Sequence, residues 1–136
     1  MDSSELKRRR TKDFALRVIR LCASLPRRAK AEVIGRQLLR AGTSVGANYR
    51  AACKARSPTE FAAKMGIVEE EADECGYWIE LLVNAAVVSE SKVRLLHKEA
   101  AELTAIAAAS RKTARLHSNN RQLAIGNRQL GRSKRA

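Results

Sequence analysis

The sequence has few of the residues that build sheets. Only 4% of its 136 residues are aromatic and only two are proline, so long stretches contain no chain-breaking residue. β-Sandwiches and barrels depend on aromatic and β-branched residues and on frequent turns, so this composition favours an all-helical chain. A chain of this length forms one domain.

Long apolar segments are also missing. No run approaches the roughly 20 apolar residues that span a bilayer. Residues 2–5 are polar and lead into no apolar segment with a small-residue cleavage site, which argues against a secretory signal. The three cysteines are odd in number and lack metal-type spacing, so they indicate reduced thiols. We therefore expect a cytoplasmic protein that does not associate with membranes.

Charge is unevenly distributed along a chain whose net charge is +13. Residues 1–56 carry 15 Lys/Arg and 4 Asp/Glu, residues 57–86 carry 1 and 7, and residues 87–136 carry 11 and 3. One acidic segment therefore lies between two basic ones. The positive surplus favours a polyanionic partner such as RNA or DNA, and the alternative is a role in solubility alone.

Apolar residues recur with helical periodicity in four segments. We expect helices over about 11–25, 28–55, 58–87 and 90–116. Short links make consecutive helices antiparallel, so the predicted fold is an all-α, up-down four-helix bundle. Residues 1–10 have no apolar stripe and are expected to form a flexible basic arm, with Thr11 capping the first helix. Residues 117–136 contain a duplicated basic unit and are expected to be a disordered basic tail.

Polar residues mark one helix boundary and one helix face. Ser57 and Glu60 form a capping box, in which each side chain accepts from the backbone amide of the other. Asn48 falls in the predicted apolar seam of the second helix, where a buried amide can fix the packing register. Ser44 lies one turn earlier and would join the same network. The alternative is a partly exposed position at which solvent satisfies both side chains.

Two carboxylates, Glu71 and Glu74, share a partly apolar helix face. Paired carboxylates can bind metal or act as acid and base, but the Glu-x-x-His motifs of a di-metal bundle are absent. We expect them to anchor an interface or to form ion pairs with Arg36, Arg40 or Arg50, and the alternative is a solvated face. The sequence indicates no catalytic residue, metal site, cofactor or small-molecule substrate.

Two motifs carry a family resemblance. They are Gln37-Leu38-x-Arg40-Ala41-x-x-Ser44-Val45-x-x-Asn48 and Ser57-x-x-Glu60-Phe61. They resemble the four-helix bundle proteins encoded in intervening sequences of bacterial 23S ribosomal RNA genes, the S23-type family, over roughly residues 12–115. The family's usual Ala-Glu-Gly is replaced here by Arg50-Ala51-Ala52, with Tyr49 in the usual Ile place. Any role of that glutamate therefore does not carry over to this chain.

The resemblance implies an up-down bundle that assembles into a ring-shaped homo-oligomer, a pentamer. It also implies kinship with the accessory proteins of diversity-generating retroelements, which present a basic surface for nucleic acid and a reverse transcriptase. The family offers no catalytic residue.

We therefore predict a non-enzymatic, ring-forming bundle that binds RNA or DNA through its basic surface. The predicted contacts are Arg17, Arg20, Arg36, Arg40, Arg50 and Lys54. Residues 7–12 and 121–135 would add non-specific affinity. The alternative is a protein-interaction scaffold in which the acidic segment of one subunit meets the basic helices of the next or of a foreign partner.

Overall fold

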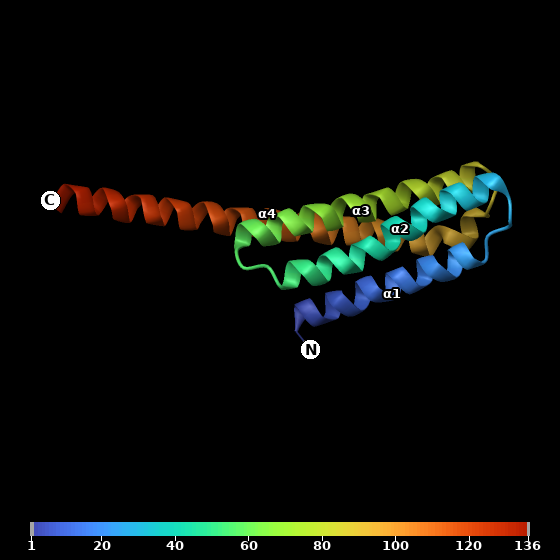
Figure 1. Ribbon diagram of the computed structural model, residues 1–136, viewed down its shortest axis with the longest axis horizontal. Helices are drawn as coiled ribbons and strands as arrows, with labels where there is room; N and C mark the ends of the chain where they lie inside the picture. The colour runs from blue at the N-terminus through green and yellow to red at the C-terminus, as the bar shows by residue number, and fades with distance from the viewer. Residues whose placement is uncertain (1, 136) are drawn as a thin grey trace.

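The protein is an antiparallel bundle of four helices in the computed structural model, which describes residues 2–135 (Figure 1). The helices are α1 (Ser3–Ala23), α2 (Ala29–Cys53), α3 (Pro58–Asn84) and α4 (Glu90–Arg135). Each helix packs against the next along the chain, and α1 also touches α4, although far more loosely than it touches α2. The predicted all-α, up-down four-helix bundle is confirmed.

The core is built from one apolar stripe on each helix, as the helical periodicity predicted. The largest fully buried side chains come from all four helices: Phe14, Val18, Leu38, Val45, Met65, Cys75, Ile79, Leu82 and Val93. Small residues fill the rest of the stripes, so the helices pack closely. The three cysteines are free; Cys75 is buried, and the other two are half-buried.

Glycines on α2 set how closely α1 approaches it. A Cβ added at Gly42 would lie 2.8 Å from Val18 Cγ1, and one added at Gly35 would lie 3.0 Å from Leu25 Cδ1. At Gly46 the nearest atom would be a backbone oxygen of α1, 3.4 Å away. The neighbour at both Gly42 and Gly46 is α1.

The flexible arm expected over residues 1–10 is corrected: residues 3–10 form the first turns of α1. Asp2 caps this helix, because its carboxylate accepts from the Glu5 amide at 2.8 Å. Thr11 does not cap the helix but is buried within it, and its hydroxyl donates to backbone carbonyls one turn earlier. Once α1 is nucleated by its packed part, adding turns of good helix-forming residues costs little. Met1 lies outside the described residues.

The disordered tail expected over residues 117–136 is also corrected, because α4 continues as a helix to Arg135. Figure 1 shows this part of α4 projecting well beyond the bundle. The docked part of α4 supplies the nucleus, so extension needs no second nucleation. The Ser118 hydroxyl lies 2.7 Å from that of Thr59, near the point where α4 leaves the bundle. Residue 136 lies outside the described residues.

The core-facing stripe of α2 passes through Tyr49 rather than Asn48. Tyr49 is 4% exposed, whereas Asn48 is partly exposed and donates to the Ser44 carbonyl of its own helix at 2.9 Å. The Ser44 hydroxyl in turn donates to the Arg40 carbonyl at 2.7 Å. The expected register-fixing network in the core is therefore wrong. Positions 48 and 49 are both close to the core-facing side of α2, and Tyr49 is buried because its aromatic ring is the larger and more apolar side chain.

The start of α3 is capped nearly as expected. The Ser57 hydroxyl accepts from the Glu60 amide at 3.1 Å, and Pro58 occupies the first helical position. The Glu60 carboxylate accepts from the Arg56 amide at 3.1 Å, one residue before the amide that the capping box predicted. At its other end α3 stops at Asn84, three residues before the expected end, and Ala86 adopts a left-handed φ of 57° in the turn.

We expect Gly42→Ala to lower the free energy of unfolding by about 1–3 kcal/mol. Alanine is the better helix former by about 1 kcal/mol, so intrinsic propensity alone would give the opposite sign. The added methyl would overlap Val18, including its Cβ at 3.0 Å, and that atom moves only if α1 moves. Urea denaturation of the two proteins measures the difference.

Gly126→Ala is the matched control, since nothing lies within 4 Å of a Cβ added there. It should retain or raise helix content without a loss of stability. Val18→Ala introduced together with Gly42→Ala should remove the overlap with the two Val18 Cγ atoms, leave the contact with Cβ, and so reduce the penalty. A Gly42→Ala protein as stable as the parent would show that the two helices do not need this close approach.

Candidate nucleic-acid interface

A groove between α1 and α2 is basic at one end. Arg8 and Lys12 of α1 and Arg50 of α2 line it, together with four small floor residues: Ala15, Thr43, Gly46 and Ala47. Arg8 and Lys12 are four residues apart and therefore share one face of α1. The volume of this end of the groove is about 430 Å³. The close α1–α2 packing thus brings cations from two distant segments of the chain together.

The three groove cations are not neutralised. No carboxylate lines this end of the groove, and among the described residues none of the three side chains forms an ion pair. The small floor residues leave room for a phosphate group between the cations. Guanidinium groups match phosphate oxygens in two-pronged geometry, and ammonium groups act as point charges. This end of the groove can therefore hold anions.

Arg40, expected at the nucleic-acid surface and also as an ion-pair partner, lies in an ion-pair cluster with α3. Its guanidinium is 3.2 Å from a Glu71 oxygen and also contacts Glu74. Glu74 accepts from the Trp78 indole at 3.0 Å as well. The Trp78 hydrogen bond, followed by Arg40, lowers the pKa of Glu74. Both carboxylates thus pair with Arg40, and neither Arg36 nor Arg50 contributes.

The other expected cations are scattered over different sides of the bundle. Arg36 lies 4.0 Å from Glu32 on the same helix. Arg17 faces α4, where it adds to the effect of the Arg10 hydrogen bond in lowering the pKa of Glu99. Arg20 is exposed on α1, and Lys54 is exposed at the C-terminal end of α2. Of the six predicted contacts, the basic end of the groove contains Arg50 alone, whereas Arg36 lines the other end of the same groove.

Two further arginines pair across the bundle. Arg10 lies 2.6 Å from Glu99 and also contacts Glu102, so it ties α1 to α4. Arg111 of α4 lies 2.7 Å from Glu69 of α3. The α3 and α4 carboxylates thus neutralise one arginine on each of α1, α2 and α4.

The sequence analysis placed Arg8 in a flexible arm and Lys12 at the start of the first helix, expected both to add only non-specific affinity, and so missed their place in a formed site. The signal that could have found them is their four-residue spacing on a segment of good helix-forming residues beginning after Asp2, a strong N-cap. Their proximity to Arg50 could not be read from the sequence, because it depends on how α1 lies against α2.

The other end of the same groove is largely apolar, although Arg27, Glu32 and Arg36 also line it. Its apolar lining comes from Ile19 and Cys22 of α1, from Leu25 just after α1, and from Leu39 of α2, around a volume of about 510 Å³. The Cys22 thiol donates to the Gly35 carbonyl at 3.4 Å, and burial raises its pKa. Ile19 and Leu39 are 42% and 36% exposed, which leaves an apolar strip on the surface.

Two features are absent from the described part of the chain. None of its helices is both long and apolar enough to cross a membrane. None of its His, Cys, Asp and Glu side chains form a group of three or more that could hold a metal ion.

We expect Glu74→Gln to lower the free energy of unfolding at pH 7 by about 0.5–1 kcal/mol, the range of a partly exposed ion pair. The pKa of Glu74 is lowered in the folded protein, so its contribution is present above the ordinary value of 4.5 and is lost as the pH falls through the lowered value. Urea denaturation at pH 7, 4.5 and 3 measures this pH dependence. Glutamine keeps an acceptor for Trp78, so the difference between the proteins should shrink towards zero at low pH. A difference that is constant with pH would contradict this role of the Glu74 charge.

Comparison with curated proteins gave no match. Among solved structures, the chain is similar to a protein with unknown function from the S23 ribosomal protein family of Bacteroides thetaiotaomicron VPI-5482. The two share 30% sequence identity and a TM-score of 0.75, and the match covers 82% of this chain and 99% of the other. Since the model of one family also matches residues 7–109, which include all of α2 and α3, the chain belongs to the family of 23S rRNA-intervening sequence proteins.

Proposed function

We propose that this protein is a non-enzymatic helical bundle that binds RNA or DNA through the basic end of the α1–α2 groove and assembles into a small homo-oligomeric ring. The observation that carries the nucleic-acid part is the convergence of Arg8, Lys12 and Arg50 on one end of the groove, which no carboxylate lines. The net charge of +13 adds long-range attraction to any polyanion.

The proposed binding is to the phosphate backbone. The groove offers charged donors and small floor residues, and its lining has no aromatic side chain on which a base could stack. Contacts of this kind position a protein on nucleic acid but carry little sequence information. We therefore expect strong dependence on salt and weak dependence on sequence. Arg20 and Lys54, exposed on the same two helices, would extend the contact.

The proposed ring uses the apolar end of the groove. Ile19 and Leu39 offer apolar surface there, and burying it against a second copy would be favourable. Glu70 and Asp73, exposed on α3, provide acidic surface on another side of the same bundle. A contact between two different faces of neighbouring copies closes into a ring when the rotation between copies is suitable. A pentamer is the form that the family resemblance implies.

The scaffold alternative has less support. It requires Glu71 and Glu74 of one subunit to anchor the basic helices of another protein. Arg40 of the same chain already contacts both carboxylates. A scaffold would have to use Glu70 and Asp73 instead.

We expect Arg8→Ala, Lys12→Ala and Arg50→Ala, combined in one protein, to weaken binding to any RNA or DNA sequence. If the unmodified protein contacts about five phosphates, log K plotted against log salt should have a slope of about −4 to −5, and losing three contacts should reduce it by about 2–3. Fluorescence anisotropy with a labelled strand at several salt concentrations gives both slopes.

The matched control combines Arg94→Ala, Lys98→Ala and Lys112→Ala, which removes the same charge from exposed positions on α4. It should bind nearly as well as the parent. Equal weakening of both triple variants would indicate attraction by overall charge rather than by the groove, and a parent slope near zero would refute phosphate binding.

Light scattering on a sizing column tests the ring. We expect a mass of about five times that of the 15.0 kDa chain for the nuclease-treated protein, and the same mass in high salt if apolar contacts hold the ring. Ile19→Asp combined with Leu39→Asp should dissociate the ring, because the change replaces apolar contact surface with charged side chains that are costly to bury. Leu95→Asp, at a position 70% exposed on α4, should leave it intact. A parent protein that runs as a monomer would rule the ring out.

A further inference from the structure

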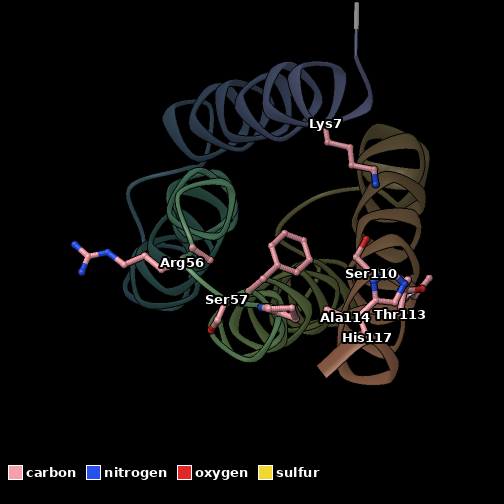
Figure 2. Close-up of a pocket in the computed structure, with 11 residues that line it drawn as sticks. Lys7, Arg56, Ser57, Ser110, Thr113, Ala114 and His117 are labelled. Carbon is pink, nitrogen blue, oxygen red and sulfur yellow. Dashed lines mark hydrogen bonds between the residues drawn. The ribbon is translucent and has the colours of Figure 1, made fainter. Parts of the chain in front are cut away.

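A second cavity lies at the end of the bundle from which α4 projects, away from the α1–α2 groove. It is bounded by the start of α1, the α2–α3 turn with the beginning of α3, and α4, and its volume is about 710 Å³. The cavity exists because α1 and α4 touch only loosely, which leaves space between them. Figure 2 looks along the bundle and shows Lys7 reaching from α1 towards Ser110 on α4, while Arg56 points away.

One side of this end cavity carries groups that suit an anion. The Lys7 ammonium, the Ser110 hydroxyl and the His117 imidazole all line it. None of these three side chains makes a side-chain hydrogen bond or ion pair among the described residues. The lining contains no carboxylate that would compete for Lys7. A cation next to unused hydrogen-bonding groups is the arrangement that holds phosphate.

The other side of the cavity is apolar. Phe61, Pro58 and Ala55 line it from the α2–α3 region, and Ala109 and Ala114 line it from α4. An aromatic ring bordered by small side chains offers a surface on which a flat ligand can stack. The cavity volume falls within the range of about 300–1,000 Å³ that is typical of small-ligand sites.

We infer that the end cavity binds a phosphorylated nucleotide, with its phosphate near Lys7 and Ser110 and its base against Phe61. The combination of a cationic, hydroxyl-bearing side and an aromatic side matches a ligand with a charged end and a flat body. The choice of a nucleotide among such ligands rests on the proposed nucleic-acid function. The nucleotide is either free or the 5′-phosphorylated end of a strand, since both carry the same chemistry.

Adenosine 5′-monophosphate is the first probe, with the full-length protein and saturation-transfer NMR as the readout. We expect saturation transfer to the base protons, and weaker binding of adenosine and of inorganic phosphate, each of which has only half of the recognised chemistry. Lys7→Met should weaken binding about tenfold, the loss expected for a charge-assisted contact, and Ser110→Ala should weaken it less. Lys98→Met, an equal change of charge at an exposed site on α4, should bind like the parent.

A strand with and without a 5′-phosphate separates the two sources. If the phosphate raises affinity in the parent protein but not in Lys7→Met, the ligand is a strand end. If adenosine monophosphate binds but the two strands bind equally, the ligand is a free nucleotide. No saturation transfer at about 1 mM nucleotide, or equal weakening by Lys7→Met and Lys98→Met, would overturn the inference.

The triple variant at Arg8, Lys12 and Arg50 separates this inference from the proposed function. It should lose strand binding and still bind adenosine monophosphate. A parent protein that binds the mononucleotide but no strand would refute the groove proposal and leave the end-cavity site standing. A parent protein that binds strands but not the mononucleotide would refute the end-cavity site and leave the groove proposal standing.

Discussion

The close approach of α1 to α2 is the constraint on which the rest of the structure depends. Val18 packs onto the face of α2 that Gly42 leaves bare, and a second glycine, Gly46, lies against the backbone of α1. Each glycine weakens α2 as an isolated helix by about 1 kcal/mol, so tertiary packing must offset that cost. The same approach forms the groove, because it brings Arg8 and Arg50 to opposite sides of a floor of small residues.

The positions of the carboxylates determine which Lys and Arg side chains are left without an ion pair and can bind an anion. The acidic residues of α3 and α4 neutralise Arg40, Arg10 and Arg111, each through a contact between two different helices. The side of the bundle formed by α1 and α2 keeps unpaired cations because few acidic residues lie there. Ion pairs thus cancel part of the positive charge of a chain with a net charge of +13. The basic end of the groove is one place where cations remain without a neighbouring carboxylate. That asymmetry gives the bundle distinct faces, which both phosphate binding and head-to-tail assembly would use.

The position of α1 also shapes the other cavity. On one side α1 is fixed by the glycines of α2, and on the other it meets α4 through Arg10 and Glu99 with few further contacts. The gap that remains places Lys7 opposite Ser110, so a single helix borders both the groove and the end cavity. The family match ends at residue 109, so the α4 residues of the end cavity from Ser110 onward lie beyond it.

The sequence by itself determined the class of fold, because apolar periodicity and the Ser57–Glu60 cap are local signals that packing did not override. It also narrowed the partners of Glu71 and Glu74 to three arginines, since spacing on a helix defines which side chains share a face. Only the tertiary structure decided which arginine pairs with them, that Tyr49 rather than Asn48 is buried, and that both terminal segments continue as helix. These outcomes depend on the rotation and distance between neighbouring helices, and on nucleation by packed segments, which no local pattern contains.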